Sequence, residues 1–547
     1  MRKPVYKSNL QGQISLFPAR LDQNIAENAP VRLVNQIVDE LDISALEKTY
    51  KGGGASSFHP GMMLKVLFYA YMNNIYSCRK IGKQLQENVH YMWLSGNQTP
   101  DFRTVNNFRS QHLKGTINQL FIQVVLMLVE MGHISLQTVY IDGTKMESRA
   151  GRYTFVWRKT VEKNKARLET KIRGILKMID EGIAQDNLPD DQPPTPINSE
   201  ELKKRIAKIN RENLSKEKQK AVKTLEEKHL PKLREYENHL KVLGTRNSYS
   251  KTDKSGTFMR LKDDHMQNGQ LKPAYNLQIG TENQFITHFD FFPNPTDTLT
   301  MVPFFQDWEK SYSAYPKTVV ADAGYGSEEN YGFMENNQVE AFVKYNYFHA
   351  EQKKKFRENA FTPENLYYNA TDDYFVCPMG QHLEKTGNKT TTNGNGYKSE
   401  ITIYQAANCT GCPLRGMCFK AKENRRIEIN HNLRRLKAKA RELLLSEEGI
   451  KHRKKRCVEP EPVFSHIRYD GGYLRFRHFG QDNVEMDFAV LAIAINLSKL
   501  SRKIDSGAKS AEKLSCKQQF FVVIRILLII KTGIRPAFLN YNTSLAA

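Results

Sequence analysis

Two aspartates each follow a short apolar run that has the composition of a buried β-strand. "TVYIDG" places Asp142 after one run, and "TVVADAG" places Asp322 after another, so we predict that each strand ends at its aspartate. Hard divalent cations such as Mg²⁺ bind oxygen ligands and keep several waters, so two or three convergent carboxylates are enough for a site. Two such ions can activate a water or hydroxyl and stabilise the leaving oxygen of a phosphodiester. The alternative is that each aspartate serves only as a turn or N-cap residue.

The net charge indicates a polyanionic partner. The 547 residues include 81 Lys and Arg against 59 Asp and Glu, which gives a formal charge of +22. Nucleic acid is the commonest partner of such an excess. Lys145, Arg149 and Arg152 follow Asp142 closely, and we expect them to neutralise DNA phosphates. A glycine shortly after each aspartate leaves room for DNA to approach.

Composition and hydropathy argue against a membrane role. Lys and Arg are spread along the whole chain, whereas membrane anchors gather them beside an apolar segment. The most apolar run, "FFVVIRILLII" at 520–530, is too short to span a bilayer and includes Arg525. The first twenty residues have no apolar segment typical of a signal peptide. We therefore expect a cytoplasmic, nucleoid-associated protein without a membrane partner.

The spacing of apolar residues before residue 115 predicts a series of short amphipathic helices. Pro60 begins the first, and "SCRKIGKQLQENVHYMWL" and "PDFRTVNNFRSQHL" follow as the second and third. Basic residues lie on the exposed side of the pattern and are candidate DNA contacts: Arg79, Lys80, Arg103 and Arg109. Short helices, tight polar turns and a basic face are typical of a helix-turn-helix-like DNA-binding domain. A plain helical bundle is the alternative.

Two apolar stripes at helical spacing lie in the charged region 158–245. One stripe consists of Leu168, Ile172, Ile175, Leu176, Ile179 and Ile183, and the other of Leu202, Ile206, Ile209 and Leu214. A Pro-rich loop separates them, so we predict an antiparallel helical hairpin. Most of its Lys and Glu would be a solvated face; a DNA clamp or subunit contact is the alternative.

Four cysteines lie in a polar segment in which we expect few strands. Cys409 and Cys412 have the C-x-x-C spacing of metal ligands, and Cys377 and Cys418 could complete a tetrahedral site. We expect a structural Zn²⁺ there, with His382 as a substitute ligand. Ordinary reduced thiols are the alternative, since cytosolic chains rarely form disulfides.

Several motifs together resemble the DDE transposases of bacterial insertion sequences. "YIDGTKMES" and "VVADAGYGSEENY" are similar to the two aspartate motifs of that family, and "KPAYNLQIG" to its strand between them. "CPLRGMC" and "EPVFSHIR" resemble its later blocks, and the N-terminal helices its DNA-binding region. The resemblance implies a mixed α/β, RNase H-like catalytic core that cuts and joins DNA with two Mg²⁺ or Mn²⁺ ions. It also implies double-stranded DNA, with terminal inverted repeats and a target, as partner, and a homodimer or higher oligomer in the active complex.

The third acid of the resemblance falls in "CVEPEPVFSHIR". The family block has the form "VEPVFG.IK", which assigns the role to Glu461, with Glu459 and Glu485 as rivals. Asp142, Asp322 and Glu461 would then be the catalytic, metal-binding residues. Arg468 matches the charge of a family lysine and is a candidate phosphate contact, because guanidinium binds phosphate bidentately.

The chain is accordingly divided into six parts. These are an N-terminal helical DNA-binding domain (1–115), the first parts of the catalytic core (116–157 and 246–350), the helical hairpin (158–245), a cysteine-cluster insertion (351–425), the last part of the core (426–505) and a helical tail (506–547). A repressor that has lost catalysis and a metal-dependent nuclease that cuts without joining are the alternative functions.

Overall fold

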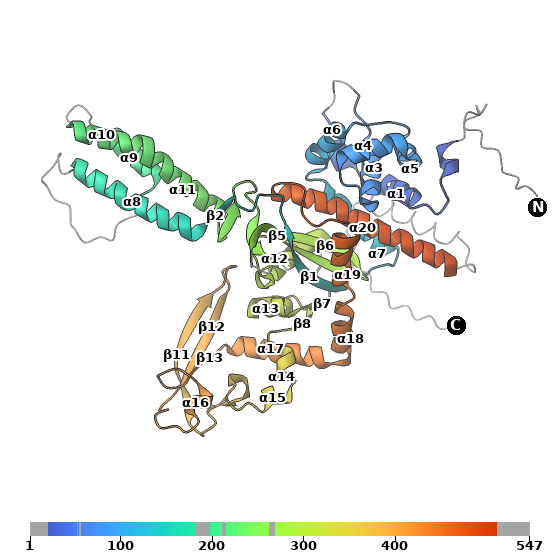
Figure 1. The fold of residues 1–547 in the computed structure, drawn as a ribbon. Coiled ribbons are helices and arrows are strands. Elements are labelled where there is room, and N and C mark those ends of the chain that lie inside the picture. The colour runs from blue at the N-terminus through green and yellow to red at the C-terminus, as the bar shows by residue number, and fades with distance from the viewer. Residues whose placement is uncertain are drawn as a thin grey trace, which may run out of the picture. The chain divides into compact units, whose positions relative to one another are not determined.

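The computed structural model describes residues 20–180, 197–209, 215–261 and 269–510, apart from residues 52, 54 and 55. The chain divides into two compact units (Figure 1). The first comprises residues 1–134 and 486–547, and the second residues 135–485. Residues 116–134 and 486–505, which we expected in the catalytic core, therefore belong to the N-terminal unit. Most of the predicted tail, residues 511–547 with the run 520–530, lies outside the described residues.

Short helices build the first unit, as predicted. They are α1 (Pro30–Glu40), α2 (Ser44–Glu47), α3 (Pro60–Met72), α4 (Cys78–Glu87), α5 (Val89–Ser95), α6 (Phe102–Asn107), a π-helical turn (Phe108–Leu113), α7 (Ile117–Glu130) and the larger part of α20 (Gln481–Ser510). The predicted second helix is two helices, because Asn88 is extended and its side chain caps α5 by accepting from the His90 amide. Asp101 caps α6 in the same way, through the Thr104 amide.

Arg109 is not on the surface of this unit, so the prediction that it is exposed is wrong. It is 5% exposed. Its Nη1 donates to the Tyr71 hydroxyl at 2.8 Å and lies 3.6 Å from the carboxylate of the buried Asp487. The Tyr71 hydroxyl in turn donates to Asp487. The π-helical turn aims Arg109 inward, and a buried charge there needs these partners.

A mixed six-stranded sheet forms the centre of the second unit. Its strands are β1 (Thr138–Glu147), β4 (Thr257–Arg260), β5 (Leu271–Glu282), β6 (Phe285–Phe292), β7 (Thr318–Ala321) and β8 (Glu340–Val343). The order is β4-β5-β1-β7-β8, with β6 also paired to β5. β5 runs antiparallel to β1, whereas β7 and β8 run parallel to it. An antiparallel half joined to a parallel half through the first strand is the RNase H-like arrangement, and β5 and β6 form an antiparallel hairpin within it.

β1 is longer than the sequence indicated. We expected the strand to end at Asp142, but it continues to Glu147 because β5 pairs with it over Tyr140–Glu147. The parallel partner β7 pairs with β1 only at Thr138–Tyr140. Asp142 therefore lies within a strand that has lost its neighbour on one side, while Asp322 does follow the end of β7, as predicted.

Helices pack against both halves of the sheet. α13 (Glu328–Asn336), α17 (His431–Leu445) and α18 (Glu447–Arg456) contact β7 or β8, whereas α12 (Met301–Tyr312) contacts β6 and α19 (Pro460–Ser465) contacts β1 and β5. One apolar cluster joins β1, β7 and β8 to α17 through Tyr140, Val320, Phe342 and Leu444. The sheet thus has the buried face that parallel strands require.

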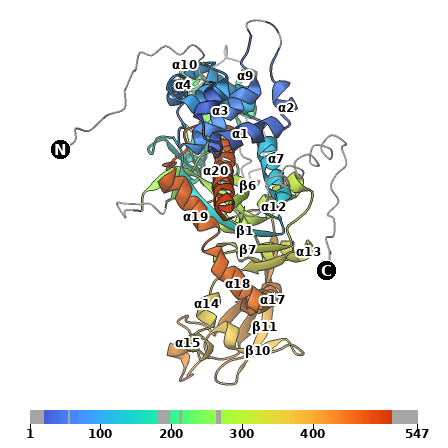
Figure 2. The same cartoon turned by 90° about the vertical axis from the view of Figure 1, so that its right-hand side faces the viewer.

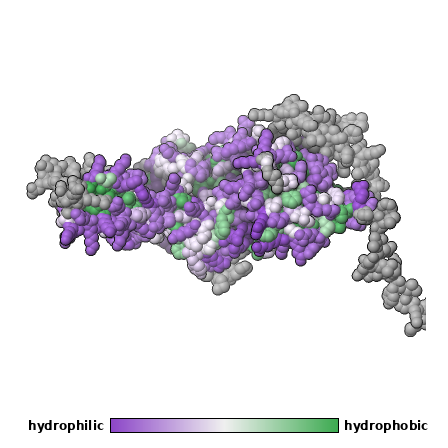
Figure 3. Space-filling view, turned by 90° about the horizontal axis from the view of Figure 1, so that it is seen from above, coloured by the Kyte–Doolittle hydropathy of each residue, from purple (hydrophilic) through white to green (hydrophobic). Residues whose placement is uncertain are grey.

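The insertion at 158–245 is a helical arm with its own apolar core (Figure 1). It contains α8 (Arg158–Asp180), α9 (Ser199–Lys208), α10 (Lys216–Thr224), a π-helical turn (Leu225–His229) and α11 (Leu230–Leu243). Leu168, Ile172, Leu202 and Ile206 of the predicted stripes are buried in it, while Ile183 and Leu214 lie outside the described residues. Most side chains on the face shown in Figure 3 are hydrophilic, including those of this arm.

The cysteine-containing insertion is a five-stranded antiparallel sheet, and the prediction that it is poor in strands is wrong. Its strands are β9 (Tyr367–Asn369), β10 (Tyr374–Val376), β11 (His382–Thr392), β12 (Lys398–Ala406) and β13 (Arg426–Ile429). β11 and β12 form a long hairpin (Figure 1; β11 is seen from another side in Figure 2) across the polar segment in which we expected few strands. Main-chain pairing does not depend on apolar side chains, so composition alone misses such strands.

Within the described part of the chain, no single helix has the length and apolarity to cross a membrane. The helices 102–113 and 117–130 meet that test only as a pair, with a bend of 82° between them.

We expect Arg109→Met to destabilise the first unit by about 3–5 kcal/mol, because it removes a cationic partner of a buried carboxylate. The matched control is Arg103→Met on the exposed face of α6, which should change stability by no more than about 0.5 kcal/mol. Urea unfolding followed by circular dichroism measures both. Equal midpoints for the two variants would contradict the structural role of Arg109.

Candidate active site

The pairing of β1 with β7 brings the two predicted aspartates together. The parallel register aligns Tyr140 with Val320, and Asp142 and Asp322 each lie two residues further along. Parallel strands in register present equivalent residues on the same face at the same end of the sheet. Beyond the last pair the strands separate. Asp322 is the N-cap of a short 3₁₀ helix (Ala323–Tyr325), and its carboxylate accepts from the Gly324 backbone amide at 2.8 Å.

The third predicted acid comes from the start of α19. Pro460 begins this helix and Glu461 lies in its first turn. α19 packs against β1. Arg468, in the π-helical turn His466–Asp470 that follows, donates to the Thr144 hydroxyl and to the Lys145 carbonyl. Arg468 therefore joins the Glu461 segment to the strand that carries Asp142, and its contact with DNA stays a prediction.

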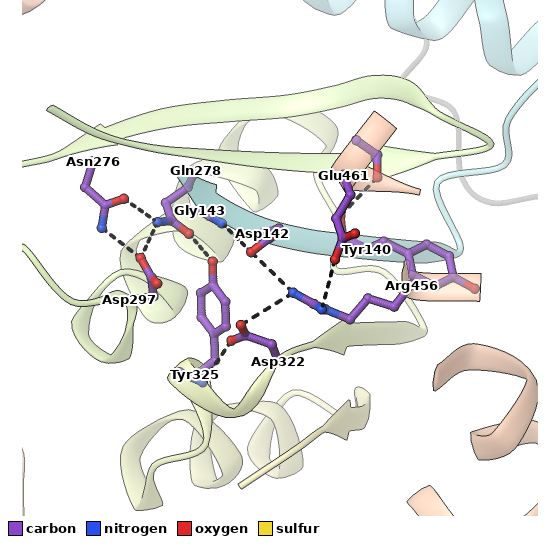
Figure 4. Close-up of polar contacts among 12 residues, drawn as sticks. Tyr140, Asp142, Gly143, Asn276, Gln278, Asp297, Asp322, Tyr325, Arg456 and Glu461 are labelled. Carbon is purple, nitrogen blue, oxygen red and sulfur yellow. Dashed lines mark hydrogen bonds and ion pairs between the residues drawn. The ribbon is translucent and has the colours of Figure 1, made fainter. Parts of the chain in front are cut away.

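All three carboxylates surround one guanidinium, that of Arg456 at the end of α18 (Figure 4). Its Nη2 is 3.3 Å from an Asp142 oxygen and 3.5 Å from an Asp322 oxygen, and its Nη1 is 4.0 Å from a Glu461 oxygen. The side chains range from nearly buried Asp142, 17% exposed, to Glu461, 57% exposed. The site thus opens to solvent on the side of Glu461.

The two rival acids lie elsewhere. Glu459 is 2% exposed and accepts from the Gln284 amide at 2.7 Å, in the turn between β5 and β6. Glu485 lies near Asp290 of β6, whose pKa is raised to about 7 by burial and then by Asp307 and Glu485. The candidate that pairs with Arg456 is Glu461, whose carboxylate lies 4.0 Å from the guanidinium.

A buried polar network lies directly behind the two aspartates. The Asp297 carboxylate accepts at 2.8 Å from the side-chain amides of both Asn276 and Gln278. The Tyr325 hydroxyl donates to the Gln278 oxygen (Figure 4). Burial raises the pKa of Tyr325 well above its usual value, and the charges of Asp297, Asp142 and Asp322 raise it further. Tyr325 therefore stays a neutral donor beside three carboxylates.

Sequence reasoning missed Arg456 and this network. "KPAYNLQIG" was interpreted only as a strand, although Asn276 and Gln278 are polar residues on one face of a strand that is buried on both. A buried amide needs hydrogen-bond partners, which was the available signal. Asp297, at the start of a 3₁₀ helix (Asp297–Leu299) after β6, and Arg456, among several basic residues of α18, gave no such signal.

The donor set of the site fits Mg²⁺ or Mn²⁺. Three carboxylates from separate elements supply the hard oxygen ligands that these ions prefer. As arranged among the described residues, no group of three or more His, Cys, Asp or Glu side chains could hold a metal ion. At this site the Arg456 guanidinium lies between the three carboxylates.

The basic residues after Asp142 have protein partners of their own. The Arg149 guanidinium donates to the Arg477 carbonyl and lies over the Phe479 ring. Arg152 is 3.8 Å from Glu147, and Lys145 is half-buried. Both arginines are exposed, so their surfaces are accessible to a polyanion.

The other predicted DNA contacts gather around one aromatic ring in the first unit. Arg79 of α4 and Arg103 of α6 both lie over the exposed ring of Phe102, at 5.2 and 5.7 Å from its centre. Lys80 is exposed beside Arg79. This basic and aromatic surface suits a phosphate backbone, whereas Arg109 is excluded from it by burial.

The four cysteines are not arranged as a metal-holding group, so the structural Zn²⁺ stays a prediction. No metal-holding group exists among the described residues, which include all four. The Cys409 sulfur accepts from the Arg425 amide and the Cys418 sulfur from the Arg425 guanidinium at 2.9 Å. Cys409 also belongs to an apolar core with Phe375 and Tyr404. Sheet pairing and this core hold the insertion together, and His382 stacks on Tyr374.

Comparison with known families supports two regions of the chain. Residues 376–501 match the family model described as "Transposase DDE domain". Residues 19–111 match the one described as "Transposase domain (DUF772)". No curated protein matches the chain. The first match includes Arg456 and Glu461 and the second includes the Arg79–Phe102–Arg103 surface, while Asp142 and Asp322 lie outside both.

We expect Gly143→Ala to lower stability by about 1–3 kcal/mol through overpacking. A Cβ at Gly143 would lie 2.2 Å from the Gln278 amide nitrogen and 2.7 Å from an Asp297 oxygen, both of which are fixed in the buried network. Gly151→Ala is the matched control, since its nearest neighbour would be 3.5 Å away. Thermal unfolding measures both variants. If Gly143→Ala unfolds at the same temperature as Gly151→Ala, the Gln278 and Asp297 side chains can shift to accommodate the added methyl group.

Proposed function

We propose that the chain is a DDE transposase of an insertion sequence, which cuts DNA at the terminal inverted repeats of its own element and joins the freed 3′ ends to target DNA. The observation that carries the proposal is the convergence of Asp142, Asp322 and Glu461, from β1, β7 and α19, on one cationic position. Three like charges from distant segments are costly to gather, so a site of this kind indicates a function.

Asp142, Asp322 and Glu461 would hold two Mg²⁺ or Mn²⁺ ions. When bound, these ions would activate a water or a DNA 3′-hydroxyl and stabilise the departing oxygen. The protein's own residues orient the substrate. The exposed arginines after β1 bind the phosphate backbone, and the Asp297–Gln278–Tyr325 network holds the two aspartates in place. The open side of the site, at Glu461, is where the DNA backbone would enter.

The N-terminal unit would recognise the ends of the element. Arg79, Lys80 and Arg103 present positive charge beside an exposed aromatic ring, on the region that matches a transposase domain. Contacts of this kind position a protein on the phosphate backbone, and base contacts from neighbouring helices would give specificity. Double-stranded DNA is therefore the proposed partner, with a homodimer or higher oligomer as the active complex and the nucleoid as its place of work.

We expect Asp142→Asn and Glu461→Gln to reduce cleavage by roughly a thousandfold while DNA affinity is retained, because each removes a metal ligand and no DNA contact. Glu459→Gln is the matched control and should keep its activity. The substrate is DNA that carries the flanks of the gene, incubated with Mg²⁺ or EDTA. Full activity of Glu461→Gln together with loss in Glu459→Gln would assign the third acid to Glu459.

The products of the same reactions separate the alternatives. Nicks with free 3′-hydroxyls and joined strands support a transposase. Nicks without joined products would indicate a nuclease, and specific binding without cleavage a repressor.

We expect the double substitution Arg149→Gln, Arg152→Gln to weaken DNA binding and to flatten its dependence on salt by about one unit of log–log slope per lost phosphate contact. Arg435→Gln is the matched control, because this exposed arginine of α17 pairs with Glu335. Fluorescence anisotropy at several salt concentrations measures the slope. An unchanged slope in the double variant would remove these arginines from the DNA interface.

A further inference from the structure

Arg456 is the unexplained cation at the centre of the site. Its side chain is 10% exposed, and three carboxylates from other elements surround it. Without a cation, these three charges would repel one another at close range. The guanidinium therefore stabilises the arrangement of the carboxylates in the DNA-free protein.

Its contacts are those of a loosely held ion. Charge-assisted hydrogen bonds to a carboxylate are typically about 2.7–2.9 Å long. Arg435 and Glu335 of this chain form such a bidentate pair, at 2.7 and 3.0 Å. Arg456 instead lies 3.3–4.0 Å from its three partners. Among the described residues, its buried Nε has no hydrogen-bond partner. The carboxylates are thus not shaped around this guanidinium.

The main chain that follows Arg456 is fixed by two hydrogen bonds. Between α18 and α19, the Gln284 side chain donates to the Val458 carbonyl at 2.7 Å, and the Gln284 backbone N–H donates to the Glu459 carboxylate. The side chain is the part that can move. It also has a cationic neighbour, Lys344, whose pKa is lowered by burial and then by the charge of Arg456. This repulsion favours the departure of the guanidinium when other cations arrive.

We propose that Arg456 is an internal counter-ion, which occupies the cation position of the free protein and is displaced when divalent cations bind. The inference rests on the proposed function, because it takes Asp142, Asp322 and Glu461 as metal ligands. It follows that metal affinity is set by competition with Arg456. A divalent ion must replace the guanidinium at the carboxylates, so the free protein binds metal more weakly than the three carboxylates alone would.

The test is Mn²⁺ binding to the full chain without DNA, measured as free Mn²⁺ by electron paramagnetic resonance. Arg456→Met should bind Mn²⁺ roughly tenfold more tightly than the wild type or better, because the competing charge is gone. It should also melt at a lower temperature in EDTA and regain stability with Mn²⁺. Arg435→Met is the matched control for net charge and should behave as the wild type.

Two further variants keep the outcome decisive. Arg456→Lys retains the charge and should bind Mn²⁺ with an affinity close to that of the wild type, even if Arg456→Met fails to fold in EDTA. Asp142→Asn combined with Arg456→Met should lose the gain in affinity. The wild type and Arg456→Met could bind Mn²⁺ with equal affinity and both lose it on Asp142→Asn. That result would overturn the role of Arg456 as a counter-ion and leave the proposed metal site intact. Mn²⁺ binding that is unchanged by Asp142→Asn, with or without Arg456→Met, would overturn both the counter-ion and the proposed metal site.

Discussion

Repulsion among three carboxylates is the constraint on which the second unit depends. Asp142, Asp322 and Glu461 come from segments more than a hundred residues apart, and folding must overcome their mutual repulsion to bring them together. Arg456 neutralises part of that charge, and Arg468 ties the segment that carries Glu461 to β1. The free energy that holds them in place comes from elsewhere, chiefly from the apolar cluster that joins the sheet to α17.

The details of the sheet follow from the same requirement. β7 leaves β1 just before the aspartates, so both carboxylates point into the space where the strands separate. β5 stays paired and places Gln278 opposite Gly143, where only a glycine lets the amide cross to Asp297. Tyr325 completes the network as a neutral donor. The buried side chains of Asn276, Gln278 and Tyr325 thus form, with the half-buried Asp297, a hydrogen-bonded network next to the two aspartates.

The two insertions leave this arrangement undisturbed because each has its own core. The helical arm buries leucines and isoleucines among its own helices, and the second sheet buries Phe375, Leu383 and Tyr404. The tip of the β11–β12 hairpin still contacts α13 next to the site, since Asn393 and Asn395 donate to Glu329. In the first unit, Arg109 and Asp487 join α20 to the short helices through a buried ion pair.

The sequence by itself determined the local pieces: the amphipathic helices near the N-terminus, the strand at "KPAYNLQIG", the two strands with aspartates and the excess of positive charge. These depend on periodicity, composition and turn residues within a few positions, which can be read along the chain. The length of β1, the burial of Arg109, the strands of the cysteine-containing insertion and the central position of Arg456 were decided only by the tertiary structure. Each depends on a partner distant in sequence, such as β5 for β1, Asp487 for Arg109 and three separate carboxylates for Arg456. The role of a polar residue depends on the side chains that surround it, and only the fold brings those side chains together.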